Sequence, residues 1–98
     1  MKILSFGEII WDVYSPTERT LGGAPLNFAA YAAMTGADVY LASAVGGDDI
    51  GREAVESVKE LGIDCRYVSV SDKVTGQCLV TLGAGGVPSY KILEDVAY

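Results

Sequence analysis

Apolar residues occur in short runs separated by polar or glycine-containing turns, which is typical of alternating strands and helices. Residues 2–10 form one such run, which predicts a mostly buried first strand that ends near Asp12. Residues 39–45 form a second run of the same kind. Because a helical segment follows each of these runs, the order predicts right-handed crossovers and a parallel sheet.

Two helices are expected beside these strands. The first begins at Pro25, which suits the first helical position, and ends before Gly36. It is apolar on almost every side, so we expect it to be buried. The second covers residues 49–61, with one apolar stripe and one charged face, and Asp48 or Asp49 is its N-cap.

The last third of the chain has a different pattern. Residues 66–70, 76–82 and 90–93 predict short strands with no helix between them, and the glycine-rich segment 83–86 predicts a hairpin loop. A small sheet of this kind, joined to a parallel core, would form a lid over a binding site.

These elements define one domain over residues 1–98. The pieces of the α/β core are expected at about 1–10 and 22–65, and the lid strands at about 11–21 and 66–93. The last residues contain neither a terminal helix nor a polar tail. We therefore expect the chain to be the N-terminal fragment of a single larger domain.

Composition and charge narrow the classes of function. Half of the residues are apolar and 20% are charged, which excludes a disordered chain, and no apolar run reaches the ~18 residues of a membrane span. The net charge of −6 argues against nucleic acid and anionic membrane as partners. The absence of histidine excludes imidazole chemistry, and Cys65 and Cys78 lack metal-ligand spacing. We expect a cytoplasmic protein with reduced cysteines.

The segment from Gly22 to Asn27 carries candidate binding chemistry. With Pro25 as the first helical residue, Ala24 would be the N-cap and could offer no side-chain oxygen to the free N–H groups. Gly22 and Gly23 would let a ligand approach the backbone, and Asn27 can both donate to and accept from a sugar hydroxyl. A tight turn before a buried helix explains the same residues equally well, so both interpretations stay open.

For two aspartates the sequence also leaves two interpretations open, ligand binding or a local structural role. Asp12 is expected at the carboxyl end of a parallel strand, where ligands of open α/β sheets bind, but an aspartate there also suits a turn. Asp48 follows Gly46-Gly47 and has the default role of a helix cap. If Asp48 is only a cap, Asp48→Asn should leave sugar kinetics nearly unchanged, because asparagine caps about as well.

Several ordered motifs together resemble the ribokinase-like (PfkB) carbohydrate kinases. Gly22-Gly23-Ala24-Pro25-x-Asn27-x-Ala29 resembles the first signature of this family. The segment 7–12 resembles the first strand of its fructokinase branch. Further similar segments lie at 45–51, 75–77 and 86–90, so the resemblance extends over essentially the whole chain.

The resemblance implies an ATP-dependent kinase that phosphorylates a sugar hydroxyl. The implied fold is ribokinase-like α/β, with a partial Rossmann-type parallel sheet, its helices and a small β-sheet lid. Asp12 and Asn27 would hydrogen-bond sugar hydroxyls, and Gly23 would admit the sugar against the backbone. The residues that the resemblance assigns to substrate binding are Asp12, Gly22, Gly23, Asn27, Cys78 and Val80.

Two departures from the family pattern refine this hypothesis. Ribokinases commonly have a lysine where Ala24 stands here, which favours a fructokinase-type substrate over ribose. The Gly-Ala-Gly-Asp motif, which supplies the anion hole and the catalytic base in the family, does not occur in the 98 residues. We therefore expect no catalytic residue in this chain, and no bound ATP or Mg²⁺, although the parent enzyme would use both.

The expected partners follow from the same reasoning. They are a small-molecule sugar and a second copy of the chain, paired as a homodimer through the open edges of the lid strands. The alternative hypothesis is a non-catalytic sugar-binding or dimerisation module that works at this length.

Overall fold

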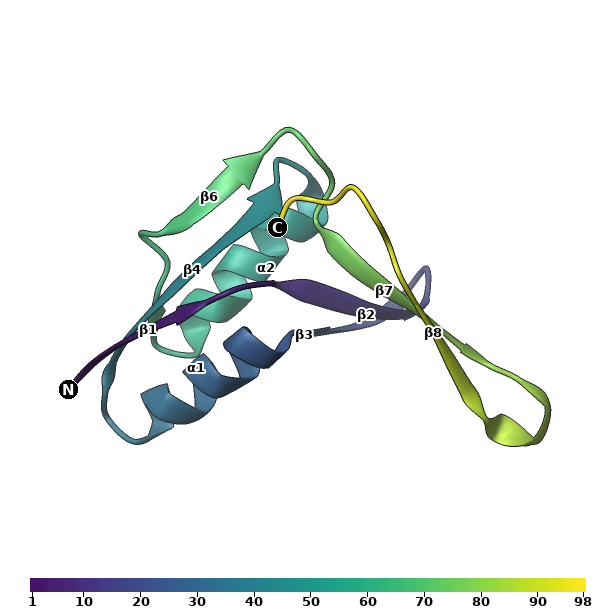
Figure 1. Ribbon diagram of the computed structural model, residues 1–98, viewed down its shortest axis with the longest axis horizontal. Helices are drawn as coiled ribbons and strands as arrows, with labels where there is room; N and C mark the ends of the chain where they lie inside the picture. The colour runs from purple at the N-terminus through teal and green to yellow at the C-terminus, as the bar shows by residue number, and fades with distance from the viewer.

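The computed structural model describes all residues 1–98 as two sheets and two helices (Figure 1). The core sheet is parallel: β1 (Lys2–Phe6) pairs with β4 (Asp38–Gly46). The other edge of β4 pairs first with β5 (Ile63–Asp64) and then with β6 (Val68–Ser71). The expected α/β class with a parallel sheet is therefore confirmed.

Both helices cover the same face of this sheet. The α1 helix (Ala24–Met34) contacts β1 and β4, and the α2 helix (Asp49–Glu60) contacts β4 and β5. Leu41 is fully buried at the centre of β4 and belongs to the same apolar core as residues of both helices. The opposite face of the sheet has no helix over it (Figure 1).

The second sheet is mixed and has the strand order β3-β2-β7-β8. The β2 strand (Ile10–Ser15) turns into the antiparallel β3 strand (Glu18–Gly22), and it also runs parallel to β7 (Gly76–Leu82). A short 3₁₀ turn (Ala84–Gly86) leads from β7 into the antiparallel β8 strand (Pro88–Ile92). We call these four strands the lid sheet.

The first strand is shorter than the apolar pattern predicts. A single strand over 2–10 was expected, but β1 ends at Phe6 and β2 begins at Ile10 in the other sheet. Gly7 separates them with φ +145°, a conformation that L side chains rarely adopt. As a consequence, Asp12 lies inside β2 rather than at the carboxyl end of the first strand.

The expected grouping of the strand at 66–70 with the lid was also wrong. The observed strand, β6, extends the core sheet beside β4, with Ser43 opposite Val68 and Gly46 opposite Ser71. Residues between β5 and β6 turn away from β4 and return to it. The alternation of apolar and polar residues in 66–70 predicts a strand, but it does not predict which of the two sheets that strand joins.

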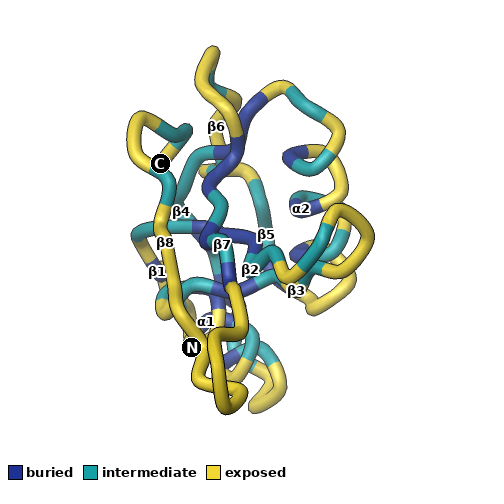
Figure 2. The backbone as a smooth tube through the Cα atoms, turned by 90° about the vertical axis from the view of Figure 1, so that its right-hand side faces the viewer, coloured by how far each residue is buried: buried dark blue, intermediate teal, exposed yellow.

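The α1 helix is less buried than its composition predicts. Leu26, Ala29 and Ala32 pack on the sheet, whereas Tyr31 and Met34 are exposed. A helix that lies on one sheet covers only one of its own faces. The outer side of α1 is therefore an apolar surface. The hairpin residues between Thr81 and Ile92 are exposed as well (Figure 2). None of the helices has the length and apolar character needed to cross a membrane.

Candidate functional site

The junction between the two sheets is built on two glycines. Gly23 has φ +106°, and a Cβ placed on it would lie 2.6 Å from the carbonyl oxygen of Glu8. A Cβ on Gly7 would lie 2.5 Å from Cγ of Pro25, and Ser5 Oγ donates a hydrogen bond to the Pro25 carbonyl at 2.8 Å. The start of α1 is therefore locked against the loop that follows β1, and only glycine fits at either position.

The lid sheet brings three of the expected binding residues onto one face. Asp12 lies opposite Thr20 on β3 and opposite Cys78 on β7. Side chains that are directly opposite in a sheet project from the same face, and Val80 lies two residues after Cys78 on that face. A Cβ on Gly22 would lie 3.7 Å from Oδ2 of Asp12. This arrangement places the Asp12 carboxylate beside the Gly22 backbone, which carries no side chain.

Asn27 lies in the first turn of α1, the helix that begins two residues after the end of β3. Gly23, not Ala24, is the N-cap, and no side chain caps the helix. The Asn27 N–H donates to the Gly23 carbonyl at 2.9 Å, and its side chain is exposed. The side chains of Asp12 and Asn27 take part in none of the side-chain hydrogen bonds or ion pairs of the chain. Both are free to bind a polar ligand.

The expected binding residues differ in accessibility. Asp12 is half-buried, whereas Cys78 and Val80 are only 6% and 7% exposed. Cys78 is a free thiol within the lid sheet. Val80 also lines a hollow of about 540 Å³ at the far end of the sheet, together with Tyr14 and Glu18.

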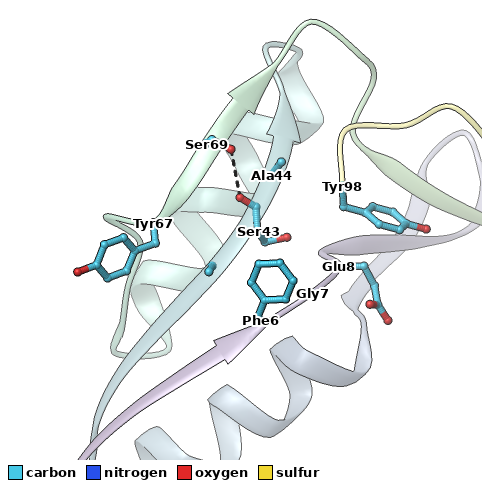
Figure 3. Close-up of a pocket in the computed structure, with 9 residues that line it drawn as sticks. Phe6, Gly7, Glu8, Ser43, Ala44, Tyr67, Ser69 and Tyr98 are labelled. Atoms are coloured by element: carbon cyan, nitrogen blue, oxygen red, sulfur yellow. Dashed lines mark hydrogen bonds between the residues drawn. The ribbon is translucent and has the colours of Figure 1, made fainter.

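A second cavity, of about 490 Å³, lies on the open face of the core sheet (Figure 3). Phe6 contributes to it from the end of β1, Ser43 and Ala44 from β4, and Tyr67 from the segment before β6. Tyr98, the last residue, lies over one end of the cavity (Figure 3). Sequence reasoning missed this cavity because the chain reverses after β8 to bring Tyr98 back, and no local pattern encodes that return.

Electrostatics in this cavity are set by two groups. Burial raises the pKa of the Tyr98 hydroxyl, and the negative charge of Glu8 adds to the shift. The phenol is therefore neutral at physiological pH and can act as a hydrogen-bond donor. No group of three or more cysteine, aspartate or glutamate side chains gathers closely enough to hold a metal ion.

Comparisons with known proteins agree on one family. Residues 2–92 match the family described as pfkB family carbohydrate kinase. Among curated proteins, the chain is 29% identical over 89 residues to the ATP-dependent 6-phosphofructokinase of Thermoanaerobacterium thermosaccharolyticum. That match covers 81% of this chain and 28% of the relative.

Solved structures give the same result. An uncharacterized sugar kinase from Pyrococcus horikoshii is 31% identical with a TM-score of 0.86, and the match covers 100% of this chain and 37% of that one. Fructokinase from Xylella fastidiosa is 29% identical with a TM-score of 0.82, covering 98% of this chain and 33% of that one. The chain thus spans about a third of the length of these structures, and its expected ribokinase-like fold is confirmed.

Proposed function

Since this chain belongs to the pfkB family of carbohydrate kinases, we propose that it is the N-terminal part of an ATP-dependent sugar kinase of the fructokinase type. The complete enzyme would transfer the terminal phosphoryl group of ATP to a sugar hydroxyl. The similarity to a fructokinase structure and to a 6-phosphofructokinase supports this substrate class.

One observation carries the proposal: Asp12, Gly22 and Cys78 share a face of the lid sheet, and the exposed Asn27 follows in the first turn of α1. An unpaired carboxylate and an unpaired amide suit the hydroxyls of a sugar, since one accepts and the other both donates and accepts. The adjacent Gly22 leaves room for a sugar ring against the backbone, because a Cβ there would meet no atom closer than 3.7 Å.

The proposed roles concern binding and orientation. Asp12 accepts hydrogen bonds from sugar hydroxyls, Asn27 bonds a further hydroxyl, and Gly22 allows close approach. Gly23 shapes the turn beside Glu8 that brings these residues together. Cys78 and Val80 supply the apolar side of the lid. Phosphoryl transfer depends strongly on positioning, so a lid that fixes the sugar contributes to rate as well as affinity.

We assign the catalytic base and the binding of ATP and Mg²⁺ to parts of the complete enzyme other than these 98 residues. The chain gathers no carboxylate cluster of the kind that holds a metal ion. We also propose that the complete enzyme is cytoplasmic.

The experiment is Asp12→Asn in the complete kinase, with Asp49→Asn as the matched control. Asp49 is exposed and pairs only with Arg52 on α2. A hydrogen bond to a charged group is worth about 1.5–3 kcal/mol, so kcat/KM for the sugar should fall roughly ten- to a hundred-fold. The KM for ATP should change far less. Unchanged sugar kinetics in Asp12→Asn would contradict the proposed site.

The isolated 98-residue chain should not consume ATP in a sugar-dependent manner. A coupled ADP assay on the mass-verified chain measures this directly. Sugar-dependent turnover by the chain alone would show that our assignment of the base and the nucleotide site is wrong.

A second candidate is a non-catalytic module that pairs with another copy through its lid strands. It is favoured by the exposed apolar residues of the outer lid, among them Leu82, Tyr90 and Ile92. The outer edges of β3 and β8 also lack a strand partner. Light scattering at tens of micromolar should detect a dimer, and Ile92→Lys should weaken it; a clean monomer would count against this candidate.

A further inference from the structure

The residue before lid strand β7 is tied to the start of α2 through one carboxylate. Asp48 is the N-cap of α2, and its Oδ1 accepts a hydrogen bond from the Gly51 N–H at 2.8 Å. The same oxygen accepts from the Thr75 hydroxyl at 2.6 Å, and Oδ2 accepts from the Thr75 N–H at 3.0 Å. Only the first of these bonds is a helix cap.

Thr75 extends this connection to the core sheet. Its hydroxyl donates to Asp48 and accepts from the Gly46 N–H, at 2.9 Å, where β4 ends. The Thr75 side chain is fully buried. Gly46, Asp48 and Thr75 therefore form one hydrogen-bonded chain, which we call the clasp, between the core sheet, α2 and the lid.

The backbone around the clasp is closely fitted. A Cβ on Gly46 would lie 2.4 Å from the Lys73 carbonyl oxygen. A Cβ on Gly51 would lie 2.1 Å from the Gly46 carbonyl oxygen and 2.7 Å from Oγ1 of Thr75. Within the Gly-Gly-Asp-x-x-Gly segment, the clasp therefore requires Gly46, Asp48 and Gly51, whereas the helix cap alone would require only Asp48.

Asparagine cannot replace Asp48 in this arrangement. Both carboxylate oxygens act only as acceptors, for three donors. An amide has one acceptor, so its NH₂ group would face either the Thr75 N–H or the Gly51 N–H and the Thr75 hydroxyl. With the amide oxygen kept at the helix cap, the bonds from the Gly51 N–H and the Thr75 hydroxyl survive. The bond from the Thr75 N–H is lost, because this donor then faces the NH₂ group and has no acceptor.

The clasp sets the position of the lid strand that carries the proposed sugar site. Gly76 follows Thr75 directly and lies opposite Ile10, which brings Cys78 opposite Asp12 two residues later. We propose that Asp48 is a positioning residue, which fixes β7 and thereby holds the sugar-binding face of the lid at the core. The last step, from strand position to sugar, rests on the proposed function.

The first test does not involve a sugar. Amide hydrogen exchange, followed by NMR on the 98-residue chain, should be about tenfold faster at Thr75 in Asp48→Asn and at Gly46 in Thr75→Val, the change expected for loss of one hydrogen bond in each case. The Gly51 amide should stay protected in Asp48→Asn, because the cap is kept. Thr75→Ser, which retains the hydroxyl, and the control Asp49→Asn should exchange as the unmodified chain does.

The second test uses the complete kinase and the same variants. Asp48→Asn and Thr75→Val should raise the KM for the sugar about tenfold and leave the KM for ATP within about twofold, and Thr75→Ser should restore the sugar KM. A variant that only destabilises the fold would lose active enzyme without this split. Unchanged exchange at Thr75, or equal changes in both KM values, would overturn the positioning role. If the unmodified kinase uses no sugar, the proposed function fails, and the exchange data alone decide whether the clasp exists.

Discussion

The core layer and the lid sheet are stabilised in different ways. In the core, β4 lies between β1 on one edge and β5 and β6 on the other. Its side chains under the two helices, Val39, Leu41 and Val45, are excluded from water. In the outer lid, every residue from Thr81 to Ile92 is exposed, and β8 is held by pairing with β7 alone (Figure 2). Apolar burial stabilises the first region, and backbone hydrogen bonds hold the second.

A few polar contacts connect the two regions. The indole N–H of Trp11 donates to the Ile50 carbonyl at 2.9 Å, and Arg19 lies 4.9 Å over the Trp11 ring and pairs with Glu53. Trp11, Arg19 and Thr75 therefore all bond to residues at the N-cap or in the first half of α2. The comparison indicates that side-chain volume matters most in the core, and hydrogen-bond geometry matters most where the lid meets it.

The largest effect should come from a core side chain. Leu41→Ala leaves a cavity at a residue that is 0% exposed, and it should lower the free energy of unfolding by about 2–5 kcal/mol. Leu82→Ala removes the same atoms from a lid residue that is 75% exposed and should change stability by no more than about 0.5 kcal/mol. Urea denaturation followed by circular dichroism measures both. Equal losses would contradict the contrast between the regions.

A smaller loss is expected at the junction. Gly51→Ala places a Cβ 2.1 Å from the Gly46 carbonyl oxygen and should destabilise the chain by about 1–3 kcal/mol, although alanine favours helices. Gly47→Ala is the matched control, because its Cβ meets only Cγ1 of Val70, at 3.6 Å. Thermal unfolding of the pair should separate them; a stabilised Gly51→Ala would show that the junction is not closely packed.

Trp11→Phe tests one contact between lid and core. The ring still packs in the core cluster, but the hydrogen bond to the Ile50 carbonyl is lost, at a cost of about 1 kcal/mol. Tyr31→Phe serves as the control, because Tyr31 is exposed and its hydroxyl has no partner within the chain. Chemical denaturation should show a lower midpoint only in Trp11→Phe. A loss that is equal in both variants would argue against this contact.

The smallest expected effect is on how the free energy of unfolding depends on pH in the acidic range. Burial raises the pKa of the Asp48 carboxyl, but hydrogen bonds from Thr75 and Gly51 outweigh burial and hold the pKa below its ordinary value of 3.8. A lowered folded-state pKa gives stability that is complete above the unfolded-state pKa. That stability is lost as the pH falls from about 5 through the folded-state value.

The free energy of unfolding should therefore decrease less steeply with acid in Asp48→Asn and in Thr75→Val than in the unmodified chain. Asp72 and Lys73 line the same shallow hollow as Asp48, and they are unchanged in both variants. Urea titrations at pH 3 to 6, roughly the window set by the carboxyl pKa, measure the slopes. Parallel acid limbs in all three proteins would contradict the role assigned to the Asp48 carboxylate.

Several parts of the fold follow from local sequence alone. The α2 helix has its cap, its apolar stripe and its glycine stop within 15 residues, Asp48 to Gly62, and β7 coincides with the predicted range 76–82. The uncapped helix start in the segment Gly22–Asn27 also follows from the sequence, because paired glycines followed by Pro25 indicate a helix N-terminus without reference to any distant residue. Such features depend on neighbours in the chain, so the sequence by itself determines them.

Other features were decided only by tertiary structure. The break at Gly7, the pairing of β6 with the core and the position of Asp12 inside β2 all depend on which distant strand offers a partner. The second role of Asp48 has the same origin, because Thr75 lies 27 residues away and becomes a neighbour only when β7 joins the lid sheet. A helix cap needs only four consecutive residues. The pairing partner of a strand and the acceptor of a buried donor come from distant parts of the chain, so only the complete fold provides them.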